Sequence, residues 1–104
     1  MSKKELPEQY LKLKEKYGDF LNAVGKLGEV VKKQGPIDEK TAHLIQLGAA
    51  IAIRSEGSVH SHVRRALETG AKPEEIYHAI IMLTSIIGFP TVSAALSWAD
   101  DVIG

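Results

Sequence analysis

Two segments of this chain are apolar around most of a helical circumference, and they limit the folds open to it. They run over residues 44–53 and 76–87. Alternating Val, Ile and Thr runs and Asn-Gly turns are absent from the sequence, so the pattern favours helices over strands. A helix that is apolar on most sides has to be covered on more than one face. The sequence therefore predicts an all-α protein in which other elements cover these two segments.

Capping and breaking residues divide the chain into about six helices. Pro7 opens the first, and the second runs over residues 20–33 until Gln34-Gly35-Pro36 ends it. Asp38 has the position of an N-cap for the third helix, and Ser55 that of an N-cap for the fourth. Pro73 opens a fifth helix that we expect to continue through residue 87. After the break at residues 88–90, the last helix covers residues 91–103.

The length of 104 residues predicts a single domain over residues 1–104 with one modest core. Four amphipathic helices in so small a protein can cover only part of the two apolar ones. We therefore expect other subunits to cover the rest, and we predict a closed, symmetric homo-oligomer.

Composition excludes several classes of function. Thirteen basic and thirteen acidic side chains cancel, so no cationic field favours nucleic acid or an anionic membrane. The chain has no cysteine, which excludes disulfides, thiolate metal sites and thiol nucleophiles. Residues 1–7 hold no apolar core of a secretory signal, and neither half of residues 76–99 is long enough to span a bilayer. We expect a cytoplasmic protein.

A cluster of serines and histidines follows the first apolar segment. On a helix, Ser58 and His62 lie about 40° apart on one face, and Ser55 extends that face at the helix entrance. His60 points to nearly the opposite side, so the His-x-His spacing makes a poor chelate there. If the third and fourth helices form an antiparallel hairpin, His43 would face the stripe of Ser58 and His62.

The same region resembles the carboxymuconolactone decarboxylase and alkylhydroperoxidase D-like family. The likeness covers about two thirds of the chain, with a motif core over residues 37–90. Its most specific part is His-x-x-x-Ala-x-x-x-Gly-Ala at residues 62–71, followed by Glu-Glu-Ile at 74–76 and Gly-Phe-Pro at 88–90. The resemblance implies a small all-helical fold that assembles into trimers or hexamers, with a site near the subunit contacts.

Redox members of that family use a Cys-x-x-Cys pair, a downstream histidine and an upstream glutamate. By position, the resemblance places the cysteines on Ser55 and Ser58, the histidine on His62 and the glutamate on His43. A serine hydroxyl neither ionises readily at neutral pH nor shuttles through a disulfide, so thiol peroxidase activity is chemically excluded. The decarboxylase branch uses acid–base chemistry on a lactone carboxylate instead.

Three functions fit these residues. The first is acid–base catalysis without a cofactor on a small carboxylated or lactone-like substrate. In it, His62, His43 and Glu56 are catalytic, and Ser58, Ser55 and Arg54 bind the substrate.

The second is a metal-binding module in which His43 and His62, with His60 or Glu56, hold Zn²⁺ or Ni²⁺. The third is a ligand-binding oligomer without catalysis. His78 is expected to line a packing interface or the edge of a pocket.

Overall fold

The computed structural model describes residues 7–104, and all regular structure in that range is helical. This confirms the predicted all-α class. Residues 1–6, which belong to the segment predicted to lack a secretory signal, lie outside the described range. The helices are α1 (Glu8–Lys16), α2 (Gly18–Lys32), α3 (Glu39–Ala52), α4 (Glu56–Glu68), α5 (Pro73–Ile81), α6 (Thr84–Ile87) and α7 (Phe89–Ile103).

The chain separates into two compact units, divided between Ile37 and Asp38. The boundary follows the Gln34-Gly35-Pro36 sequence that ends α2. The sequence predicted one domain over residues 1–104, and within that length the contacts gather into these two units.

The first unit contains α1 and α2, which are separated by the non-helical backbone of Tyr17. Neither helix buries a residue. An apolar stripe on α2 repeats at helical spacing through Phe20, Val24, Leu27 and Val31, and these four side chains are between 48% and 62% exposed. Within the first unit, α1 therefore leaves this face of α2 uncovered.

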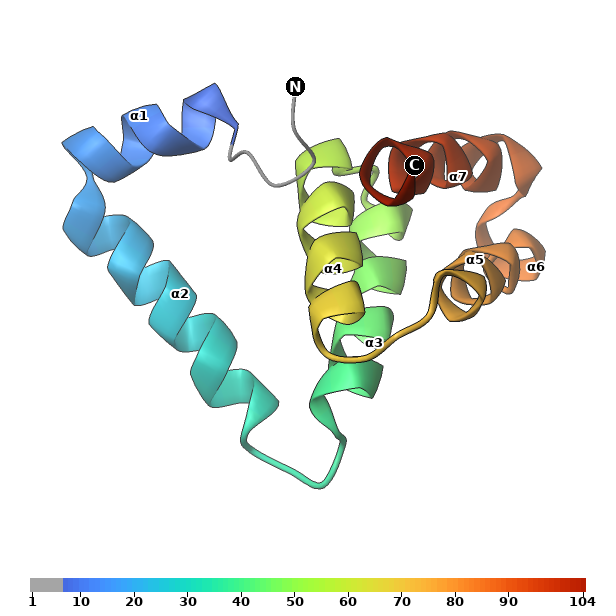
Figure 1. Ribbon diagram of the computed structural model, residues 1–104, viewed down its shortest axis with the longest axis horizontal. Coiled ribbons are helices and arrows are strands. Elements are labelled where there is room, and N and C mark those ends of the chain that lie inside the picture. Colours follow the sequence, from blue (N-terminus) through green and yellow to red (C-terminus); the bar gives the residue numbers. More distant parts are fainter. Residues whose placement is uncertain (1–6) are drawn as a thin grey trace. The chain divides into compact units, whose positions relative to one another are not determined.

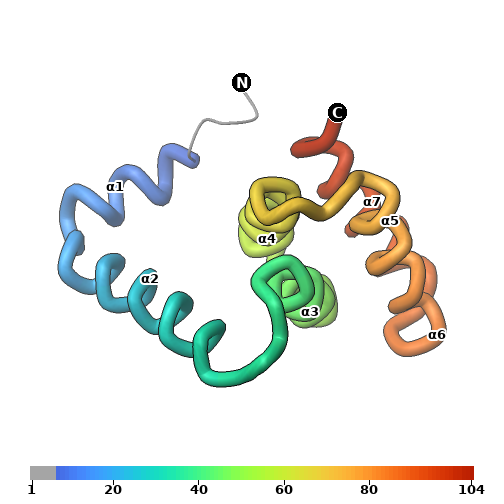
Figure 2. Tube along the Cα trace, turned by 60° about the horizontal axis from the view of Figure 1, so that its bottom comes forward, coloured from blue at the N-terminus to red at the C-terminus, as the bar shows by residue number. Residues whose placement is uncertain are grey.

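The second unit is built on an antiparallel hairpin of α3 and α4, which lie side by side in both views (Figures 1 and 2). Asp38 caps α3, since its carboxylate accepts a hydrogen bond of 2.7 Å from the Thr41 amide. The hydrogen bonding to Thr41 lowers the pKa of Asp38. Arg54 makes the turn between the helices with a left-handed φ of 59°.

The core of the second unit lies where α7 packs across α4 and α5. The largest side chains that are fully buried come from α3, α4, α5 and α7: Leu47, Ile51, Val59, Val63, Ile76, Ile80 and Val92. Four of these seven belong to the two apolar segments of the sequence, as expected for segments that need covering. The cover is incomplete, because Ile45 is 55% exposed, Ile53 75% and Ile86 80%.

The fifth helix is shorter than the sequence predicted. It ends at Ile81 rather than at residue 87, and the single-turn helix α6 follows. The amide of Leu83 bonds to the Ile80 carbonyl in a tighter turn, and the Thr84 hydroxyl donates to the Ile81 carbonyl at 2.7 Å. A local side-chain hydrogen bond of this kind competes with the helical ladder. The chain then turns at Gly88, whose φ is +90°, and α7 begins at Phe89.

No helix within residues 7–104 is both long enough and apolar enough to cross a membrane. This agrees with the expectation drawn from residues 76–99, which the structure divides among α5, α6 and α7.

Candidate functional site

Two imidazoles meet across the α3–α4 hairpin. The Nδ1 atoms of His43 on α3 and His62 on α4 lie 3.4 Å apart, and the ring centroids are separated by 5.7 Å at an interplanar angle of 44°. His43 is 3% exposed, whereas His62 is only half-buried. The antiparallel hairpin thus places an inner and an outer imidazole at hydrogen-bond distance.

The facing Nδ1 atoms determine what the histidine pair can do chemically. Whichever ring carries a proton on Nδ1 donates to the lone pair of the other, and the tautomers exchange roles when that proton moves. Two Nδ1–H groups facing each other would repel, so the contact suits one shared proton. The pair can accept a proton at one ring and pass one to the other, as acid–base chemistry requires.

The serines of the cluster lie on the same helix as His62. Ser58 is half-buried and sits one turn before His62 on α4. Ser55 occupies the N-cap position of α4, as predicted, but its hydroxyl makes no capping hydrogen bond. The sequence explained Ser55 as a capping residue, but the Ser55 side chain does not cap α4 in the structure. Arg54, the predicted carboxylate-binding residue, is exposed in the turn just before α4.

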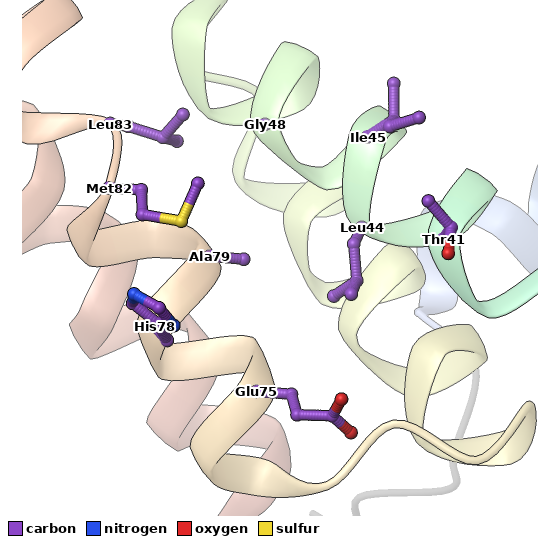
Figure 3. Close-up of a pocket in the computed structure, with 9 residues that line it drawn as sticks. All are labelled: Thr41, Leu44, Ile45, Gly48, Glu75, His78, Ala79, Met82 and Leu83. Carbon is purple, nitrogen blue, oxygen red and sulfur yellow. The ribbon is translucent and has the colours of Figure 1, made fainter.

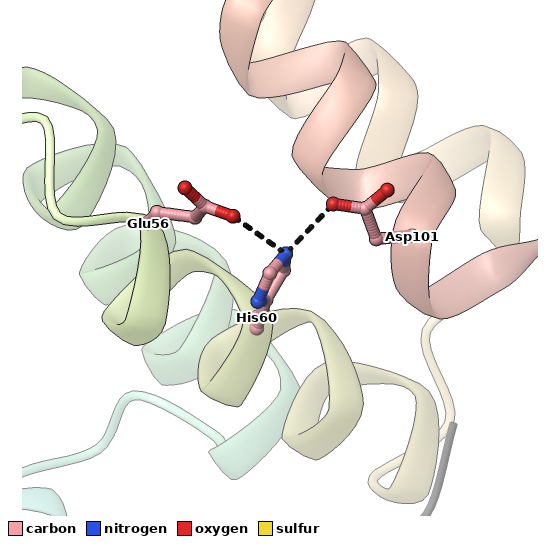
Figure 4. Close-up of side chains that lie close together, drawn as sticks. All are labelled: Glu56, His60 and Asp101. Carbon is pink, nitrogen blue, oxygen red and sulfur yellow. Dashed lines mark hydrogen bonds and ion pairs between the residues drawn. The ribbon is translucent and has the colours of Figure 1, made fainter. Parts of the chain in front are cut away.

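Glu56, which the sequence analysis grouped with His62 and His43 as catalytic, contacts His60 in the structure. Its Oε2 lies 3.8 Å from Nε2 of His60, one turn along α4, and the same Nε2 lies 3.0 Å from Oδ2 of Asp101 on α7. Figure 4 shows the His60 ring between the two carboxylates. Helical geometry turns Glu56 about 120° away from His62. Glu56 is therefore positioned to orient His60.

The three-histidine set considered for a metal is not gathered in this structure. His60 and His62 are two positions apart on one helix, so His60 faces α7 while His62 faces His43. Within residues 7–104, one group of three His, Asp or Glu side chains has its ligand atoms all within 4.8 Å of one another, and it consists of Glu56, His60 and Asp101. Sequence reasoning missed Asp101, because no spacing rule links it to a residue 41 positions earlier.

A groove of about 420 Å³ lies between α3 and α5 (Figure 3). Leu44 of α3 and Met82, the residue that follows α5, extend into it from opposite sides, and His78 lines it, in keeping with the predicted pocket edge. Neither His43 nor His62 belongs to its lining. The histidine pair lies on the α4 side of α3, so this groove and the pair are separate features.

An ion pair between α3 and α5 lies at the groove. The Lys40 ammonium is 3.1 Å from Oε2 of Glu75, whose Oε1 also accepts a hydrogen bond from the Lys72 amide. The Lys72 amide and, after it, the Lys40 ammonium lower the pKa of the Glu75 carboxyl. On the other side of α5, the Tyr77 hydroxyl donates to Asp100 at 2.6 Å, and this bond raises the pKa of Tyr77.

Comparisons with known proteins agree with this architecture. The family model described as the carboxymuconolactone decarboxylase family matches residues 18–101. The fold is similar to the crystal structure of the apo form of a carboxymuconolactone decarboxylase family protein from Legionella pneumophila. The TM-score is 0.76 at 22% identity, over 91% of this chain and 85% of that one. A comparison with curated proteins finds no match. Because the family model spans most of its length, this chain belongs to the carboxymuconolactone decarboxylase family.

Proposed function

We propose that this protein catalyses an acid–base reaction on a small carboxylated or lactone-like substrate and that His43 and His62 exchange the proton. The observation that carries the proposal is the 3.4 Å contact between the two Nδ1 atoms. Imidazoles suit this work because they gain and lose protons near neutral pH. Membership of the decarboxylase family supports the choice of substrate class. The chain has no cysteine, so the reaction does not use a thiol.

The two histidines would have different tasks. His62 is half-buried and is the ring that a substrate would reach, so we assign it the proton transfer to and from substrate. His43 is buried behind it and would hold the shared proton in place and fix the tautomer of His62. Glu56 has no part in this proton path, because its carboxylate lies against His60.

The substrate contacts would come from the start of α4. Ser58 and Ser55 would donate hydrogen bonds to a lactone or carboxylate oxygen, since both hydroxyls lie on the turns that precede His62. Arg54 would hold the carboxylate, for which its planar guanidinium offers two parallel N–H donors. An anion bound there would also face the positive end of the α4 dipole.

We also propose that the chain works as a homo-oligomer, a trimer or a hexamer, with the site close to a subunit contact. Ile53, Ile86 and Phe89 of the second unit support this, because they are 65% to 80% exposed, and so does the apolar stripe of α2, which the first unit leaves uncovered. An isolated monomer that exposed so much apolar surface would tend to associate.

The test is turnover of a panel of carboxylated γ-lactones, measured as substrate loss and carbon dioxide release. We expect the wild type to turn over at least one compound. In His62→Gln, which removes the imidazole but keeps a polar side chain, we expect kcat to fall by a factor of about 100 or more. His78→Gln is the matched control, since His78 lies on α5 in the separate groove. We expect it to retain wild-type turnover. Full activity in His62→Gln, or binding of the panel without any turnover, contradicts the proposal.

A further inference from the structure

We propose that Glu56, His60 and Asp101 form a binding site for a divalent transition-metal ion such as Zn²⁺ and that this ion joins α4 to α7. The site is distinct from the histidine pair of the proposed function. It draws one ligand from each of two adjacent turns of α4 and the third from the last helix of the chain.

The spacing of the ligand atoms fits one ion. Ligands about 2.1 Å from a tetrahedral zinc ion lie about 3.4 Å from one another. His60 Nε2 lies 3.0 Å from Asp101 Oδ2 and 3.8 Å from Glu56 Oε2, on either side of that value. All three atoms lie within 4.8 Å of one another, so small rotations of the carboxylates are enough to bring them around one centre. In Figure 4 both carboxylates point toward Nε2 of the ring.

The helices that carry the ligands are fixed by core packing at the adjacent positions. Val59 precedes His60 and is fully buried, and Val102 follows Asp101 and is 8% exposed. Both valines belong to the core in which α4 and α7 pack together. Glu56 and His60 are one turn apart on a regular helix, so their relative position is set by the backbone. Core packing next to His60 and Asp101 therefore fixes the backbone positions from which these ligands project.

The charge balance favours a cation. Two carboxylates meet at this point, and within residues 7–104 no lysine or arginine comes within ion-pair distance of either of them. A protonated His60 would supply one positive charge, whereas a divalent ion bound by neutral His60 balances both carboxylates. An imidazole ligand selects zinc and its transition-metal neighbours over Mg²⁺ and Ca²⁺, which prefer oxygen.

Exposure indicates an ion that is open to solvent. The side chain of His60 is 25% exposed, and those of Glu56 and Asp101 are 56% and 55% exposed. Three protein ligands at such a surface leave a fourth position for water. The ion would be exchangeable, and removing one ligand would weaken binding without unfolding the protein.

The experiment is isothermal titration of the full-length, tag-free, chelator-treated protein with ZnCl₂ at neutral pH. We expect one zinc ion per chain. His60→Ala and Asp101→Asn should each weaken binding about tenfold or more while leaving the far-UV circular dichroism spectrum unchanged. His78→Ala is the control, because it removes an exposed histidine outside the cluster, and its affinity should equal that of the wild type.

Two results overturn this inference. One is the absence of saturable zinc binding to the wild type. The other is binding that survives in His60→Ala but is lost in His62→Ala, which would assign the ion to the histidine pair. Neither measurement depends on turnover, so the zinc site and the acid–base function can fail separately.

Discussion

The contact between His43 and His62 predicts a specific pattern of stabilities when each imidazole is replaced by an apolar side chain of similar volume. A hydrogen bond contributes a net of about 0.5–1.5 kcal/mol, while a buried polar group that loses its partner costs about 1–3 kcal/mol. The Nδ1–Nδ1 distance of 3.4 Å is long for a hydrogen bond, which points to the lower part of these ranges.

The burial of the two rings makes the single variants unequal. His62→Leu removes the ring that faces the buried Nδ1 of His43, and we expect the loss of this contact to cost about 1–2 kcal/mol of unfolding free energy. His43→Leu removes the same contact from the side of His62, which is only half-buried, so the cost in unfolding free energy should be smaller. The double variant replaces both polar groups. We expect its loss of unfolding free energy to be about 1 kcal/mol smaller than the sum of the losses in the two single variants.

The measurement is urea unfolding followed by circular dichroism for the wild type and the three variants. All four are compared at one protein concentration, since association would change the apparent stability. In thermal unfolding, each kcal/mol corresponds to about 4–8 °C in the midpoint for a domain of this size. Additivity of the two single effects within about 0.5 kcal/mol would refute the reasoning, because it would mean that the rings do not interact.

Two further predictions concern the groove and the apolar surface. Hydrogen bonding to the Lys72 amide lowers the pKa of Glu75 in the folded protein. The ionised Glu75 carboxylate therefore stabilises the fold at a pH above its ordinary pKa of 4.5, and this stabilisation is lost as the pH falls through the lower pKa of the folded state. The gap in unfolding free energy between wild type and Glu75→Gln should therefore be larger at pH 7 than at pH 3, with Glu74→Gln as control, and an equal gap at both values would be evidence against this. If the α2 stripe is a subunit contact, Leu27→Glu should lower the mass of the oligomer measured by light scattering. Asn22→Glu, on another face of α2, should leave that mass unchanged. An unaltered mass in Leu27→Glu would show that the α2 stripe is not part of the subunit interface.

Local features of the sequence were enough to predict most of the secondary structure. Asp38, Ser55 and Pro73 lie at the starts of helices as their capping and N-terminal preferences indicate. These preferences act over one or two turns, so they can be read without knowledge of the fold. The end of α5 was mispredicted, because the Thr84 hydroxyl bonds to the Ile81 carbonyl and favours a turn within an otherwise helical apolar pattern.

Helical periodicity also separated the two histidines of α4, since residues two positions apart on a helix face in different directions. It paired His62 with His43 only on the assumption that the third and fourth helices form a hairpin, and it did not identify a partner for His60. His43 comes to His62 through the packing of α3 on α4, and Asp101 comes to His60 through the packing of α7 on α4. Contacts between residues 19 and 41 positions apart depend on how helices associate. The sequence alone thus determined the helices and the directions of their polar side chains, while tertiary packing decided which side chains meet, because burial of the apolar faces sets the helix register.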